Sequence, residues 1–193
     1  MGNLSVYDWL AFLFSAGAYI PYVQSVLASK TRPTISSWIS WGVMDVVILV
    51  GMIANGAMSW QLAAYCVGSL AVILVSLFKR ATLGWTRFDT VCVTIVAFAI
   101  LLWMTTGNPT TAIVASLVAS SIGSFPFLKN VWEEPRNETP LPWLMFFAGS
   151  LCQLTAIKEW DITEAATPLV YLVVQVAAII FISRKFLTPA RDG

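Results

Sequence analysis

Seven apolar stretches, each close to the length of one membrane crossing, limit what this chain folds into. The hydrocarbon core of a bilayer is about 30 Å thick and takes about 20 helical residues. Hydrophobic residues make up 58% of the 193 residues and charged residues only 11%, too little charge to cover a soluble domain. We therefore predict an all-α integral membrane protein whose seven transmembrane helices span residues 6 to 28, 36 to 56, 59 to 78, 88 to 106, 109 to 131, 142 to 157 and 165 to 184.

The distribution of positive charge predicts how these helices are oriented. Cytoplasmic loops of membrane proteins carry an excess of Lys and Arg. If the N-terminus lies outside and the helices alternate in direction, only Lys158 of the eleven Lys and Arg lies outside. The C-terminus is then cytoplasmic, together with Lys30, Arg32, Lys79, Arg80, Arg87, Lys129, Arg136, Arg184, Lys185 and Arg191.

The first apolar stretch does not have the features of a removable signal. It has no Lys or Arg before it and no small-residue cleavage site after it, so we expect it to remain as a helix. The expected location is the plasma membrane, as a multi-pass protein.

An internal repeat divides the chain. Residues 19 to 38 and residues 124 to 143 carry the same residue types at four positions separated by 105: Pro21 and Pro126, Val26 and Val131, Thr34 and Thr139, Trp38 and Trp143. We predict two three-helix repeats, at 1–80 and 108–193, joined by a linker helix within 81–107. Because one helix lies between them, the two repeats are parallel in the membrane, an arrangement that builds transporters.

With this three-plus-one-plus-three layout the chain resembles the PQ-loop superfamily, which includes the SWEET sugar transporters. The resemblance covers essentially the whole length, and it rests on the layout, the short cationic loops, the prolines Pro21 and Pro126, and the opening Ser36-Ser37-Trp38 of the second helix, followed by Gly42 and Asp45. It implies a seven-helix transporter fold in which the two repeats rock against each other.

Asp45 is the most informative single residue. It lies near the middle of the second predicted helix, where an ionised carboxylate costs about 2.5 to 3.5 kcal/mol on insertion scales. No Lys or Arg lies at the same depth in another predicted helix. Asp45 is therefore either a protonated acid or a group that faces a polar pathway, and both suit proton coupling in a carrier. The alternative is a neutral acid that is bonded to a neighbouring helix.

Six polar residues are candidates for contact with a solute. Tyr65 and Ser69 are four residues apart in the third helix, as Tyr171 and Gln175 are in the seventh, so each pair shares a helix face. Gln153 in the sixth helix and Asn55 near the outer end of the second complete the set. The alternatives are bonds between helices for Tyr and Ser, and a turn at Asn55.

Pro21 and Pro126 lie inside predicted helices, where proline removes a hydrogen bond and favours a kink. Each is a candidate hinge, with a fixed bend as the alternative. The matched Trp38 and Trp143 are candidates for an inner gate.

Catalysis is not expected. The sequence has no His, its three Cys lack metal-site spacing, and no nucleophile motif is present, so we predict no enzyme activity, metal or other cofactor. The predicted function is secondary transport of a small polar solute such as a sugar, an amino acid or a vitamin-like compound, by alternating access. The predicted partners are that solute, lipid and protons, with no nucleic acid; a homo-oligomer stays open. The alternative is a receptor or sorting protein of the same fold that binds a ligand without moving it.

Overall fold

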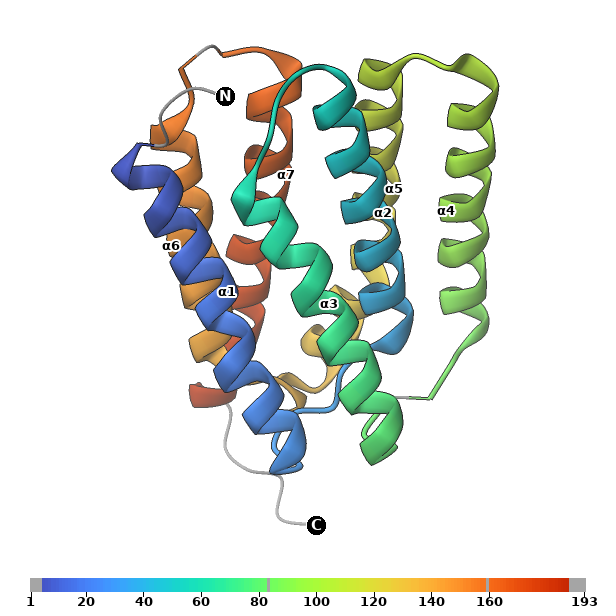
Figure 1. Cartoon of the computed structure of the whole chain (residues 1–193). Helices are drawn as coiled ribbons and strands as arrows, with labels where there is room; N and C mark the ends of the chain where they lie inside the picture. Colours follow the sequence, from blue (N-terminus) through green and yellow to red (C-terminus); the bar gives the residue numbers. More distant parts are fainter. Residues whose placement is uncertain (1–4, 83, 159, 188–193) are drawn as a thin grey trace.

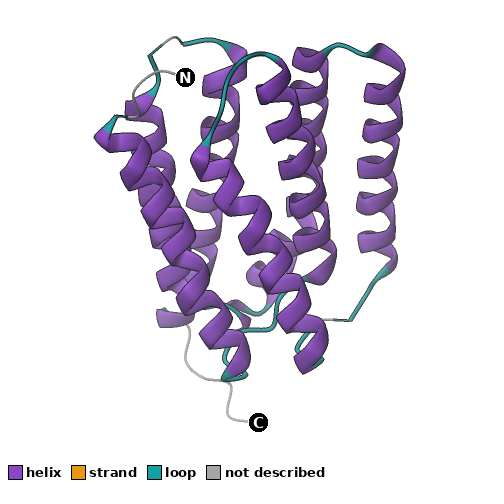
Figure 2. Cartoon of the chain, in the orientation of Figure 1, coloured by secondary structure: helices purple, strands orange, loops and turns teal. Residues whose placement is uncertain are grey.

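The structure is a computed structural model that describes residues 5–82, 84–158 and 160–187. Within these residues it contains helices and loops but no strand (Figure 2). Two short 3₁₀ turns, Pro135–Asn137 and Arg184–Phe186, follow the fifth and seventh α-helices. The seven α-helices are α1 (Val6–Leu27), α2 (Ile35–Ala54), α3 (Trp60–Lys79), α4 (Arg87–Thr106), α5 (Pro109–Glu133), α6 (Pro140–Ala156) and α7 (Ile162–Ser183).

The seven predicted helices are confirmed, and no end differs from its prediction by more than three residues. The largest difference is the start of α7, predicted at 165 and found at Ile162. Asp161 explains it, because its carboxylate accepts a hydrogen bond from the backbone N–H of Glu164 at 2.9 Å. This N-cap satisfies a free donor of the first turn and starts the helix earlier than hydrophobicity alone indicates.

Five helices are long and apolar enough to cross a membrane: α1, α2, α3, α5 and α7. α6 has 17 residues, which at the usual helical rise make it about 26 Å long, slightly less than the hydrocarbon core. α4 begins with charged residues, among them Asp89. The chain is therefore a bundle of helices with several membrane-spanning candidates, as an integral membrane protein requires.

The helices pack in the same way in both halves of the chain. α3 packs against both α1 and α2, and α7 packs against both α5 and α6. We call α1–α3 the first triplet and α5–α7 the second triplet. The two triplets meet through α1 against α6 and through α2 against α5. α4 stands at the edge of the bundle, mainly beside α5 (Figure 1). Without α4, an exchange of α1–α3 for α5–α7 leaves this pattern of contacts unchanged.

Glycines let the helices approach one another closely where the site is built. A Cβ atom at Gly68 of α3 would lie 2.1 Å from the ring of Tyr19 on α1. A Cβ atom at Gly123 of α5 would lie 2.6 Å from the Cβ of Ser40 on α2. Both distances are too short for a Cβ atom, so a residue larger than glycine would force its neighbour to shift. Small residues are common where membrane helices touch.

Pro21 and Pro126 lie inside α1 and α5, as predicted. Near Pro126, the backbone N–H of Phe127 donates to Ser37 Oγ of α2 at 3.1 Å. A neighbouring helix thus supplies a bond where proline disturbs the helical ladder. In the other half, the position that matches Ser37 is Pro142, which has no hydroxyl.

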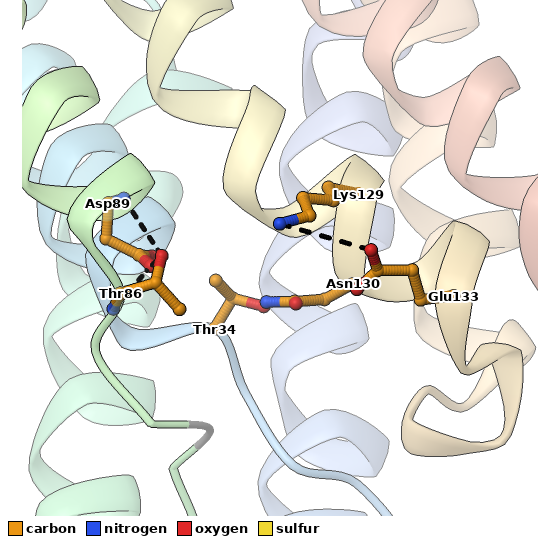
Figure 3. Close-up of polar contacts among 6 residues, drawn as sticks. All are labelled: Thr34, Thr86, Asp89, Lys129, Asn130 and Glu133. Atoms are coloured by element: carbon orange, nitrogen blue, oxygen red, sulfur yellow. Dashed lines mark hydrogen bonds and ion pairs between the residues drawn. The ribbon is translucent and has the colours of Figure 1, made fainter.

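The first turn of α2 is held from two sides (Figure 3). Asn130 Nδ2 of α5 donates to Thr34 Oγ1 at 3.0 Å. Ser36 Oγ of α2 donates to Asp89 of α4, and Asp89 in turn accepts the backbone N–H of Thr86 at 2.9 Å. The helix that carries Asp45 is therefore anchored at its start.

Candidate functional site

A cavity lies between the two triplets. The space between its walls is about 520 Å³, a volume that includes solvent outside the opening. Six helices contribute to its wall, and α4 contributes none of the described lining residues. The wall is formed by Tyr19, Trp38, Trp41, Asp45, Tyr65, Ser69, Ser120, Ser124, Trp143, Phe146, Val170, Tyr171, Val174 and Gln175.

The wall follows the internal repeat. Ten of its fourteen residues form five pairs whose members are 105 positions apart in the sequence. Equivalent positions of the two triplets therefore line the cavity from opposite sides. The pairs are Tyr19 and Ser124, Trp38 and Trp143, Trp41 and Phe146, Tyr65 and Val170, and Ser69 and Val174.

One face of α2 supplies the only carboxyl group among these lining residues. Trp38, Trp41 and Asp45 are spaced i, i+3 and i+7, which places them on the same side of the helix. Asp45 is 3% exposed. Tyr171 of α7 donates its hydroxyl proton to Asp45 Oδ1 and so connects the two triplets across the cavity.

Tyr65 is the centre of a second group of polar contacts. Its hydroxyl accepts hydrogen bonds from Gln61 Nε2 at 3.0 Å and from Gln175 Nε2 at 3.3 Å. Gln61 also donates to Ser15 Oγ at 3.0 Å. The other amide atom of Gln175, Oε1, is buried and has no hydrogen-bond partner among the described residues. Gln175, one of the lining residues, thus carries an acceptor atom that no described residue uses.

Seven of the fourteen lining residues are aromatic, and their rings meet at steep angles. The planes of Trp38 and Trp41 are 83° apart, with ring centroids 5.3 Å apart. Trp41 and Trp143 meet at 67°, and Tyr65 and Phe146 at 74°. Edge-to-face contacts of this kind are favourable and rigid. They make a box of aromatic walls rather than a stack.

A buried carboxyl group outside the predicted spans connects the two gate candidates. Trp38 Nε1 donates to Tyr22 Oη at 3.2 Å, and Tyr22 Oη donates to Glu138 Oε1 at 2.9 Å. Trp143 Nε1 donates to Glu138 Oε2 at 3.3 Å. We call these four side chains the Glu138 network. Lys185 Nζ, at the end of α7, donates to the backbone oxygen of Glu138 at 2.8 Å.

Burial raises the pKa of Glu138 from an ordinary 4.5 to about 8, although the bonds from Tyr22 and Trp143 act in the opposite direction. This carboxyl group is 2% exposed. Its protonation therefore changes within the physiological range, at the point where both tryptophans are held.

The structure brings together most of the candidates from the sequence. Tyr65, Ser69, Tyr171 and Gln175 line the cavity with Asp45, as do Trp38 and Trp143. Asn55 does not: it is exposed at the end of α2, where its Nδ2 donates to Thr110 Oγ1 at 3.3 Å. Gln153 is partly buried on α6 and is absent from the described lining residues.

Sequence reasoning missed several residues of the site. Tyr19 and Phe146 line the cavity, and Glu138 contacts Trp143 directly and Trp38 through Tyr22. The repeat contained a signal for Tyr19, because it matches Ser124, another lining residue, at the 105-residue offset. Glu138 matches Pro33 and gave no such signal.

The described residues hold no group of three or more Cys, Asp or Glu side chains arranged for a metal ion. The chain matches no known protein family, no curated protein and no solved structure.

Proposed function

We propose that this protein is a secondary transporter of a small polar solute, with the solute site in the cavity between the two triplets. The observation that carries the proposal is the five pairs of repeat-matched residues in the cavity wall. A site that two equivalent halves build from matching positions can open to one side or the other when the halves rock, which is the geometry of alternating access.

The membrane topology that we propose is three-plus-one-plus-three, with α4 as the linker, the N-terminus outside and the C-terminus in the cytoplasm. Three observations support it. The triplets have the same helix contacts, α1 begins and α7 ends at opposite ends of the bundle (Figure 1), and Lys and Arg are concentrated at one end. That end carries Lys30, Arg32, Lys79, Arg80, Arg87, Lys129, Arg136, Arg184 and Lys185, whereas Lys158 lies at the other. The layout is that of the PQ-loop superfamily, to which we propose the chain is related, and the plasma membrane is the proposed location.

Within this mechanism Asp45 is the proton-coupling group and the two tryptophans form the inner gate. Asp45 is buried in the cavity wall and contacts the opposite triplet through Tyr171. Trp38 and Trp143 come from opposite triplets and share the Glu138 network. Rocking of the triplets must separate these tryptophans, and Pro21 and Pro126 are placed where α1 and α5 can bend.

Transport by purified protein in liposomes tests the proposal. The liposomes receive a mixed pool of sugars, amino acids, vitamins and nucleosides, with and without an imposed pH gradient, and their contents are read by mass spectrometry. Protein-free liposomes are the control. We expect one class of solute to enter faster than in the control, and its accumulation above the outside concentration to require the gradient.

Entry of no solute under any condition would contradict the proposal and favour a receptor of the same fold. Accumulation that is the same in Asp45→Asn liposomes would leave transport intact and remove Asp45 from the coupling.

A further inference from the structure

We propose that the cavity binds a small organic cation with an ammonium group, whose charge is balanced by Asp45. This proposal rests on the proposed function for the place of the site, and it adds the chemical class of the solute.

The first argument is charge. Among the fourteen described lining residues Asp45 is the only acid, and none is Lys or Arg. Among the described residues, no Lys or Arg forms a salt bridge with Asp45. A buried carboxylate with a single hydrogen bond, from Tyr171, is poorly compensated. A bound cation supplies the charge that the protein does not.

The second argument is the aromatic wall. Electron-rich ring faces attract ammonium groups, and boxes of several aromatic residues are the usual protein site for methylated ammonium groups. Here Trp41 and Trp38 lie one and two turns before Asp45 on the same face of α2. Trp143 and Phe146 face them from the other triplet, and Trp41 and Trp143 are 6.1 Å apart between ring centroids.

The third argument separates a cation from a neutral sugar. Aromatic walls also suit sugars, but a neutral sugar compensates no charge, so Asp45 would have to hold a proton while the sugar is bound. The free acceptor Gln175 Oε1 lies in the same wall, bonded through its amide nitrogen to Tyr65. Two acceptors and no cationic donor among the described lining residues are the complement of a ligand that carries a positive charge and a hydrogen-bond donor.

The same carboxylate cannot hold a proton and balance a cation at once. The other titratable side chains that interact with Asp45 are Tyr19 of α1, Tyr65 and Cys66 of α3, and Tyr171 of α7. α5 adds serines to the wall, and α4 packs against the other face of α2, with Val96 in contact with Met44 and Val47. Cation and proton therefore compete, and acidification weakens binding of a cation whose own charge does not titrate. A carrier with this property exchanges the cation for protons.

Two probes of the same shape test the inference. Choline and its uncharged carbon analogue 3,3-dimethyl-1-butanol differ in charge alone, so choline need not be the natural solute. Binding to purified protein in detergent is followed by tryptophan fluorescence, since three tryptophans line the cavity. We expect choline to bind at least about tenfold more tightly than the analogue, because that ratio corresponds to a single favourable charge interaction.

Two of the variants replace an acid by its amide, which has nearly the same size, and a third keeps the acid. We expect Asp45→Asn to bring the ratio of the two affinities, choline over the analogue, close to one and to abolish the dependence of this ratio on pH. Asp45→Glu keeps the carboxyl group and should keep a clear preference for choline. Glu133→Gln, an exposed carboxyl on α5, leaves the ratio unchanged. Thermal unfolding of each variant shows that it is folded.

Equal binding of both probes by the wild-type protein, or a preference for choline that survives Asp45→Asn, would overturn the inference. The two proposals fail separately. Choline binding without flux of any solute would contradict transport and keep the cation site, while flux of a neutral solute with equal binding of both probes would keep transport and contradict the cation site.

Discussion

The two triplets have the same helix packing but differ at the cavity that they share. Where the first triplet has Tyr19, Trp41, Tyr65 and Ser69, the second has Ser124, Phe146, Val170 and Val174. Only Trp38 and Trp143 are identical among the five pairs. The position that matches Asp45 is Ser150.

This difference separates scaffold from recognition. A pathway between two rocking halves requires that the halves pack alike, and the matched prolines and tryptophans meet that need. A solute without two-fold symmetry requires unequal walls. The first triplet supplies the only carboxyl group and four of the seven aromatic side chains among the described lining residues, while both triplets supply polar groups. We therefore expect changes in the first triplet to alter function more than changes at the matched positions of the second.

The largest effect is expected from the pair Asp45 and Ser150. Asp45→Asn should lower solute flux at least about tenfold, because removal of one partner of a buried charge pair costs about 2 kcal/mol or more. Ser150→Ala should leave flux within about fivefold, since neutral side-chain hydrogen bonds contribute about 1 kcal/mol or less. Flux into liposomes measures both, and equal losses would contradict the functional difference between the triplets.

The pair Gly68 and Val173 tests the packing beneath the site. Gly68→Ala places a methyl group against the Tyr19 ring and should destabilise the protein by about 1 to 3 kcal/mol, as overpacking does, and reduce flux by displacing Tyr19. Val173, the matched residue on α7, is 69% exposed, and Val173→Ala should change stability by about 0.5 kcal/mol or less. Denaturation in detergent compares them. A silent Gly68→Ala would show that Tyr19 does not lie against α3.

Glu138, which has Pro33 as its counterpart, should make stability depend on pH. Its pKa in the folded protein is about 8 against an ordinary 4.5, so between these values the folded state holds a proton that the unfolded state releases. Its contribution to stability is complete below about pH 4.5 and is lost as the pH rises through about 8. The unfolding temperature of the wild type should fall over this range, and that of Glu138→Gln should fall less. Identical pH profiles would show that Glu138 does not take up a proton on folding.

The smallest effect is expected at the surface ion pair of α5 (Figure 3). Lys129 Nζ and Glu133 Oε1 are 4.0 Å apart, and both side chains are at least half exposed. Exposed pairs contribute about 0.2 to 1 kcal/mol. Lys129→Ala should therefore lower the unfolding temperature by no more than about 4 °C. A larger loss would mean that Lys129 supports the end of α5 in another way, for example through the Phe88 ring, whose centroid is 5.5 Å from its Nζ.

Helix positions were predictable because length and hydrophobicity define a membrane-spanning segment, and turn residues mark its ends. The charged and polar members of the site were also predictable, since Asp45 stands out in an apolar helix and Tyr171 and Gln175 share a face. In contrast, the sequence did not predict which side of the other helices faces the cavity. A membrane helix is apolar toward lipid and toward its neighbours, so periodicity does not indicate which face of α1 carries Tyr19.

Glu138 shows a different limit. In the sequence it is one of several acids in a polar connection, beside Glu133 and Glu134. It is buried only because this connection folds back under α1 and α7, where Tyr22 and Lys185 contact it. The contact between Tyr22 and Glu138 joins residues 116 positions apart, and the local composition of the sequence contains no signal for it. Asn55, in contrast, follows local rules and ends α2 as its Asn-Gly turn indicates.

The central claim is that solute passes through the cavity between the triplets, and a reversible block at Ser69 tests it most directly. Cys66, Cys92 and Cys152 are first replaced by Ala, and Ser69, which lines the cavity, is changed to Cys. Flux of a solute that enters wild-type liposomes is then measured before and after reaction with a water-soluble methanethiosulfonate, and again after reduction. We predict that flux stops on modification and returns on reduction, within the same folded sample. A thiol that is fully modified without loss of flux, or one that the reagent never reaches during transport, would contradict the account.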